Sequence, residues 1–209
     1  INLKKTDLDG RIVNQDLMMD FTSVYDDKTL VHVASEVSKE DGKYRLHLNP
    51  EDLIFNFQEW QIPASNEVLI KDYYAEFMDF RLTNGEQVVE FSEKMEEANK
   101  EHVGIRFNNF ELSTFLSYFN PVDSLAKGQL NGNFIVEEPF VNNGLLADLQ
   151  IRKFEVKNVE LGVLDLDASA SGTQDYIFDL GLSKGLINMD LTGNYSAAET
   201  GAEVNMELI

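Results

Sequence analysis

Apolar and polar residues alternate along most of this chain, which is the period of a β-strand with one face buried. The most regular run covers residues 164–171, where Leu164, Leu166, Ala168 and Ala170 alternate with aspartate and serine. Similar runs predict further strands at 31–33, 44–48, 53–57, 78–82, 103–107, 176–182, 187–192 and 203–208. The pattern therefore predicts a mainly β protein with strands along its whole length.

Short segments that contain glycine separate several of these runs. Examples are Ser171-Gly172-Thr173, Lys184-Gly185 and Glu199-Thr200-Gly201. Glycine readily adopts the positive φ angles that tight connections need. Consecutive strands joined in this way are predicted to pair antiparallel.

One segment departs from the period of two. In FELSTFLSYFNP the apolar residues from Leu112 to Phe119 fall at positions i, i+3, i+4 and i+7, and Asn120-Pro121 ends the run. We expect one short amphipathic helix near residues 111–119. The segment 92–101 has helix-forming residues but a single apolar one, so it is predicted to be a solvated hairpin connection.

No stretch rich in proline, glycine or serine marks a domain border. We expect a single elongated unit over 1–209, with a first strand series in 1–109, the helix in 110–120 and a second strand series in 121–209. An all-β chain of this length hides its sheet edges by closing into a barrel or by splitting into a sandwich. A sheet bent into a trough would instead leave an apolar channel exposed.

The charge of the chain limits the partners that we expect. Seventeen basic and thirty-seven acidic residues give a formal net charge of −20, which repels nucleic-acid phosphates and the anionic face of a bilayer. We therefore expect no nucleic-acid partner and no electrostatic docking on membranes. No run approaches the roughly 18 apolar residues of a membrane span. Because the chain starts at Ile1, we interpret it as a piece of a longer protein whose anchor lies outside it.

The residue types offer little for catalysis. There is no cysteine, and no GxSxG, P-loop or GxGxxG motif occurs. His32, His47 and His102 are expected to be solvated surface residues, because no further ligand lies at a suitable spacing beside them. The single tryptophan, Trp60, is predicted to occupy a buried strand position. We expect neither an enzyme nor a bound cofactor or metal.

An ordered series of motifs in the second half is similar to one found in a known family. The series consists of the helix from Glu111 to Phe119, Gly128-Gln129-Leu130-Asn131-Gly132, Pro139, Gly144-Leu145, Leu161-Gly162-Val163-Leu164 and Leu191-Thr192-Gly193-Asn194-Tyr195. It resembles the TamB-like members of the AsmA-type bridge lipid-transfer proteins of Gram-negative envelopes. The first half, with LHLNPEDLIFNFQEWQIPASNEVLI and FMDFRLTNGEQVVEF, resembles the versions from the Bacteroidetes lineage.

The resemblance implies a fold, a location and partners. The fold would be an antiparallel sheet curled into an open U-shaped groove, the β-taco type. The chain would be the periplasmic section of a protein that is anchored in the inner membrane elsewhere. It would shield phospholipid acyl chains on their way to the outer membrane, with an outer-membrane barrel of the BamA-related type as partner of other parts of the protein.

On this interpretation the residues that contact lipid are the apolar members of the second strand series. The residues expected to line the lipid groove are Leu145, Leu149, Ile151, Leu164, Leu166, Phe178, Leu180, Leu182, Ile187, Met189 and Leu191. The same pattern also fits a structural or interaction β-sandwich whose core is closed and holds no ligand. A carbohydrate-active fold would further require two carboxylates facing each other across a cleft.

Overall fold

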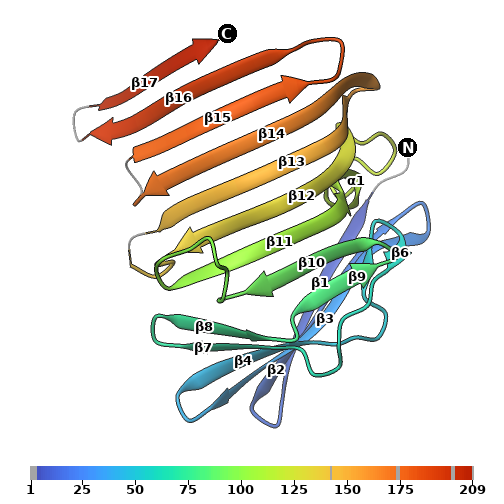
Figure 1. The fold of residues 1–209 in the computed structure, drawn as a ribbon. Helices are drawn as coiled ribbons and strands as arrows, with labels where there is room; N and C mark the ends of the chain where they lie inside the picture. The colour runs from blue at the N-terminus through green and yellow to red at the C-terminus, as the bar shows by residue number, and fades with distance from the viewer. Residues whose placement is uncertain (1–3, 142, 173–174, 199–200, 209) are drawn as a thin grey trace.

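The computed structural model describes residues 4–141, 143–172, 175–198 and 201–208 (Figure 1). In these residues the protein is mainly β, with two antiparallel sheets and one short helix. The end strands of each sheet do not pair with each other, so neither sheet closes into a barrel. The predicted fold class is confirmed at this level.

The first sheet contains eight strands in the order β1-β2-β3-β4-β7-β8, with β5 paired to β3 and β6 paired to β5. Its strands are β1 Lys5–Val13, β2 Asp16–Tyr25, β3 Lys28–Glu40, β4 Lys43–Leu48, β5 Ile54–Phe55, β6 Gln58–Glu59, β7 Glu67–Lys71 and β8 Tyr74–Met78. Consecutive long strands are joined by tight turns such as Asp26-Asp27, where both residues have positive φ.

The second sheet contains nine strands, which follow one another in chain order from β9 to β17. They are β9 Arg81–Asn84, β10 Gln87–Ser92, β11 His102–Glu111, β12 Ala126–Glu137, β13 Gly144–Val156, β14 Val159–Ser171, β15 Asp175–Ser183, β16 Met189–Ala198 and β17 Gly201–Leu208. Every neighbouring pair is antiparallel, as the glycine-containing turns predicted.

The chain passes from the first sheet to the second at Asp79 and Phe80. Met78 ends β8 in one sheet and Leu82 lies in β9 of the other, so the single strand predicted at 78–82 is wrong. Asp79 has a φ of +49°, which turns the backbone between the two strands. The alternation of apolar and polar residues continues through this corner, because Phe80 is buried in the core that both sheets share.

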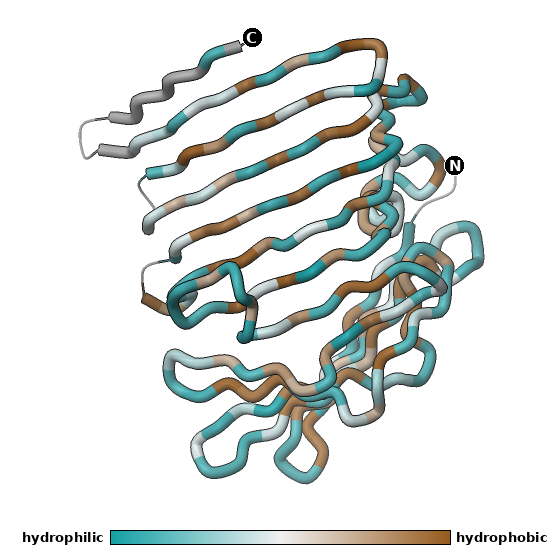
Figure 2. The backbone as a smooth tube through the Cα atoms, viewed as in Figure 1, coloured by the Kyte–Doolittle hydropathy of each residue, from teal (hydrophilic) through white to brown (hydrophobic). Residues whose placement is uncertain are grey.

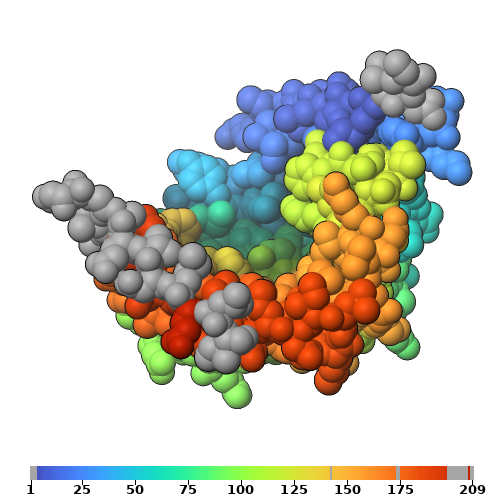
Figure 3. Space-filling view, turned by 90° about the horizontal axis from the view of Figure 1, so that it is seen from above, coloured from blue at the N-terminus to red at the C-terminus, as the bar shows by residue number. Residues whose placement is uncertain are grey.

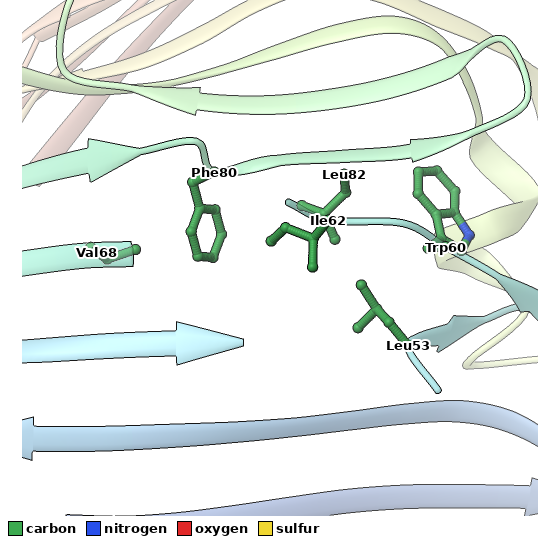
Figure 4. Close-up of a cluster of buried hydrophobic side chains, with 6 residues drawn as sticks. All are labelled: Leu53, Trp60, Ile62, Val68, Phe80 and Leu82. Carbon is green, nitrogen blue, oxygen red and sulfur yellow. The ribbon is translucent and has the colours of Figure 1, made fainter. Parts of the chain in front are cut away.

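Both sheets contribute to one hydrophobic core beside this corner. Its buried residues are Leu53, Trp60, Ile62, Val68, Phe80 and Leu82 (Figure 4). The partly buried residues packed against it are Val33, Leu46, Leu48, Phe55, Ile70, Phe77, Val89, Phe91 and Phe110. Aromatic edge contacts stabilise the junction: the Phe80 and Phe91 ring centroids lie 5.3 Å apart, and those of Phe55 and Trp60 lie 6.0 Å apart.

Three local predictions need correction. The helix α1 covers Leu112–Leu116 and is shorter than expected, because β11 continues to Glu111 and residues 117–119 form turns. Phe57 is not in a strand, since its φ of +62° turns the chain after β5. Trp60 is buried as predicted, but it follows the two-residue strand β6 and is not part of it.

The connection 93–101 joins β10 to β11 and is not fully solvated. Its one long apolar side chain, Met95, is buried against Gly104, and a Cβ at position 104 would overlap its sulfur atom. The backbone N–H of Met95 donates a hydrogen bond to Nε2 of His102 at 2.7 Å. The segment therefore covers part of one face of the second sheet.

Two glycines bend β12. Gly128 has a φ of +140° and Gly132 a φ of +116°. The pairing register shifts beside both of them, between Lys127 and Gln129 in β12 and between Phe107 and Phe110 in β11. Such bulges bend a strand and increase its twist, and this gives a physical reason for the spacing Gly-x-x-x-Gly in the sequence.

Candidate functional site

The second sheet has one apolar face that extends over most of its strands. In an antiparallel sheet, directly paired residues lie on the same face. One such row across the sheet consists of Leu82, Val89, Phe107, Gly132, Leu149, Leu166, Leu180 and Leu191. A second row consists of Phe110, Leu130, Ile151, Leu164, Leu182 and Met189. Figure 2 shows the resulting alternation of hydrophobic and hydrophilic segments along these strands.

Ten of the eleven residues expected to line a groove lie on this face. Eight belong to the two rows, Phe178 pairs with Ala168, and Leu145 pairs with Ala170. Ile187 is the exception, because it precedes β16 in a loop and is 55% exposed. The strand predicted at 187–192 therefore begins two residues later, at Met189.

The opposite face of the same strands carries a row of acidic residues. Asp148, Asp167 and Asp179 are direct neighbours across β13, β14 and β15, and all three are exposed. Beside them the side-chain amide of Gln150 donates a hydrogen bond to Asp165 at 2.8 Å. Like charges placed directly opposite each other are destabilising, so this face depends on water for its stability.

The apolar face is continuous with the shared core. Leu82, Val89 and Phe110 belong to the rows and also to the core cluster, whereas none of the residues of β13–β16 whose side chains the structure describes does. The first sheet has a matching row that consists of Ile12, Leu17, Val37, Leu46, Val68 and Phe77. That row also starts in the core and ends at exposed residues, since Ile12 is 77% exposed. Each sheet thus carries apolar surface from the junction outward.

A cavity of about 310 Å³ lies where the two apolar faces meet. Its lining residues are Val31, Phe55, Trp60, Leu82, Val89, Phe91, Phe110, Thr114, Phe115 and Tyr118. From above, the surface is hollowed between the first strands and β14–β16 (Figure 3). The sequence prediction missed these lining residues because it considered the second strand series, although the alternation at Val31 and Phe55 indicated them.

The segment that contains α1 connects the two sheets at one end of this hollow. Gln87 of β10 accepts hydrogen bonds from the backbone N–H of Glu111 and from the Thr114 hydroxyl, at 2.9 and 3.3 Å. On the other side the Tyr118 ring lies 6.3 Å from that of Phe21, and Lys4 Nζ donates to the Tyr118 carbonyl at 2.8 Å. The helix is therefore held against both sheets.

The three histidines are not solvated surface residues as predicted. Each is partly buried and forms a hydrogen bond with a backbone carbonyl: His32 with Asp52, His47 with Asn66 and His102 with Lys100. Among the described residues, no three His, Asp or Glu side chains are grouped so that they could hold a metal ion. Sequence spacing missed the bonds of His32 and His47 because their acceptors lie in loops between other strands.

His32 makes stability depend on pH. Burial alone lowers its pKa, but the hydrogen bond to the Asp52 carbonyl and the contact with Asp20 at 3.2 Å outweigh burial and raise the pKa above its ordinary 6.5. A raised pKa stabilises the fold at pH values below 6.5, and this contribution is lost as pH rises through the folded-state pKa.

We therefore expect His32→Gln to cost less than about 1 kcal/mol of unfolding free energy at about pH 5.5, because Asp20 is half exposed, and still less at about pH 8.5. Urea denaturation of both proteins at the two pH values measures this difference. A difference that grows with pH would contradict the assignment.

The fold and this face define a class of protein: a two-sheet β protein with an extended apolar face. None of the helices in the described part of the chain is long and apolar enough to cross a membrane. No protein-family model matches the chain, and neither a curated protein nor a solved structure matches it.

Proposed function

We propose that the protein binds phospholipid acyl chains in a U-shaped groove whose walls are the apolar faces of its two sheets. The observation that carries this proposal is the continuity of the apolar rows from β9 to β16 on a face that leaves the shared core at β11. The core forms the base of the groove, and α1 stands at one end.

Acyl chains suit such a surface because they need no directional contacts. Each buried CH₂ group contributes about 0.8 kcal/mol whatever apolar residue lies beside it. Seven strand spacings separate β9 from β16, so the face extends about 34 Å across the strands. This exceeds the roughly 15 Å of one bilayer leaflet's hydrocarbon, and one chain could therefore lie along the groove.

The resemblance described above supports a cellular setting for this activity. In that setting the chain is a periplasmic section of a longer envelope protein anchored in the inner membrane. Lipid would pass along the groove toward the outer membrane, where other parts of the protein meet a barrel of the BamA-related type. The acidic outer face keeps such a section soluble in the aqueous periplasm.

Leu180→Arg tests the groove, with Asp179→Arg as its matched control. The two residues are neighbours on β15, but Leu180 lies between Leu166 and Leu191 on the apolar face and Asp179 lies between Asp167 and Thr192 on the acidic face. Both variants add the same side chain, and only the first places a charge where acyl chains would lie. We expect Leu180→Arg to reduce bound phospholipid about tenfold and Asp179→Arg to leave it unchanged.

Native mass spectrometry of the chain after incubation with phospholipid micelles measures the bound lipid. A wild-type chain that binds no lipid, or two arginine variants that lose it equally, would count against the groove. Complete protection of Leu180 from solvent-borne labels would instead support the closed interaction module.

A further inference from the structure

The strand ends of the second sheet beside α1, with the connections between them, combine exposed apolar and basic side chains. We define this rim as residues 112–127, 152–162 and 184–188, which are the helix segment, the β13–β14 hairpin and the loop before β16 (Figure 1). The three segments are adjacent: the Lys157 N–H donates to the Leu125 carbonyl at 3.2 Å, and a Cβ on Gly185 would overlap the Leu161 backbone.

Large apolar side chains of the rim are exposed to solvent. The most exposed are Phe115 at 62%, Phe119 at 64%, Val122 at 75%, Leu125 at 49%, Leu186 at 81% and Ile187 at 55%. Phe115 and Phe119 pack edge to face with ring centroids 5.6 Å apart, so part of the surface is a preformed aromatic cluster. Exposed apolar clusters of this kind mark surfaces that contact a membrane or a partner.

The rim has a positive formal net charge, whereas the whole chain has a negative one. It holds five basic and three acidic residues, in a chain of net charge −20. Lys127 pairs with Glu155 at 2.8 Å. Among the described residues, no carboxylate lies within ion-pair distance of Lys153, Lys157 or Lys184.

The connections at the opposite ends of the same strands, here called the acidic edge, are mainly acidic. Its segments 93–101 and 137–141 contain six acidic residues and two lysines. Both lysines are paired, Lys94 with Glu93 and Lys100 with Glu138, each at 2.8 Å. The sheet is therefore polarised from an acidic edge to a basic and apolar edge.

We propose that the rim docks on the surface of an anionic lipid bilayer. Its lysines match anionic headgroups, and its exposed leucine, isoleucine and phenylalanine side chains match the acyl boundary beneath them. The acidic edge, at the other end of the strands, would point away from that surface. Phe115 of the rim also lines the cavity at the base of the proposed groove, but the rim lysines, Leu186 and Ile187 do not, so the inference does not rest on acyl-chain binding by the groove.

Co-flotation of the chain with vesicles tests the proposal. We expect binding to vesicles of phosphatidylcholine and phosphatidylglycerol in equal parts, weak binding to phosphatidylcholine alone, and a decrease with added NaCl. The variant Lys153→Gln/Lys157→Gln/Lys184→Gln should bind about 100-fold more weakly, since each lysine near an anionic surface contributes about fivefold. Leu186→Ser/Ile187→Ser should weaken binding at least about tenfold.

Matched controls come from the acidic edge. Lys94→Gln/Lys100→Gln neutralises two lysines there, and Phe140→Ser/Val141→Ser removes two side chains that are 45% and 74% exposed. Both controls should bind as the wild type does. Lys157→Gln alone, in an exposed turn, should give about a fivefold loss without affecting folding as seen by circular dichroism.

Three results would overturn the proposal. They are a wild-type chain that floats with neither vesicle, equal binding to both vesicle types, and losses in the acidic-edge controls as large as those in the rim variants. Finding lipid bound in the groove by native mass spectrometry would not rescue the docking proposal. The flotation variants change the rim lysines, Leu186 and Ile187, whereas mass spectrometry measures lipid bound in the groove.

Discussion

Replacing Gly132 with alanine is expected to destabilise the protein by more than about 3 kcal/mol. Gly132 has a φ of +116°, which L side chains rarely adopt, and an added Cβ would overlap the carbonyl oxygen of Asp148 on the neighbouring strand. Backbone atoms paired in the middle of a sheet cannot move aside cheaply. Either β12 straightens or its pairing with β13 is lost.

Gly10→Ala provides the matched control, because Gly10 also lies within a strand but has no atom within 4 Å of its added Cβ. Its φ is not positive, so alanine should be neutral or stabilise by up to about 1 kcal/mol through the unfolded state. Chemical denaturation measures both free energies. Equal effects of the two substitutions would show that Gly132 does not hold the bend.

Trp60→Ala is expected to cost about 3–5 kcal/mol of unfolding free energy. Trp60 is 3% exposed at the junction of the two sheets and contacts the rings of Phe55 and Phe110, each at 6.0 Å. Its removal would leave a cavity next to the one that already exists there. Because the core holds both sheets, the loss affects the whole fold.

Trp60→Phe should cost much less, below about 1.5 kcal/mol. The indole Nε1 has no hydrogen-bond partner among the described residues. Removing this buried donor relieves a desolvation penalty of about 1–3 kcal/mol, which offsets part of the lost packing. Urea denaturation followed by circular dichroism compares the two variants. A phenylalanine variant as unstable as the alanine variant would show that the N–H has a partner.

The sequence predicted the strands of the second half well, because each of them is long and has one polar face. The run from Leu164 to Ser171 lies within β14, and the alternation of Leu180 with Asp179 places them on opposite faces of β15 as expected. Here the local pattern and the tertiary structure agree, since a period of two by itself separates the two faces of a strand.

The sequence predictions failed where the pattern spans a corner or an end. Met78, Phe80 and Leu82 have the period of one strand, yet they belong to β8, the connection and β9, because both sheets bury residues at the same core. Ile187 continues the pattern of β16 but lies in the preceding loop. Periodicity reports which residues are apolar, and it does not report where the backbone turns.

The histidines show a similar limit. His32 and His47 alternate with apolar residues and were therefore expected in solvent. Their partners Asp52 and Asn66 are about twenty residues away in sequence, in loops that fold back over the strands. Hydrogen bonds between distant loops leave no local pattern from which to predict them.

The sequence by itself determined two sets of residues, one apolar and one largely acidic, which alternate residue by residue along each strand, and it contains none of the catalytic motifs considered. The tertiary structure decided which strands share the core and which do not, because this depends on the corner at Asp79 and on the bends at Gly128 and Gly132. It also decided the distribution of charge. The net charge of −20 predicted repulsion from anionic bilayers, but antiparallel pairing gathers Lys153, Lys157 and Lys184 at one edge. A net charge is a sum over residues, whereas a docking surface depends on their positions.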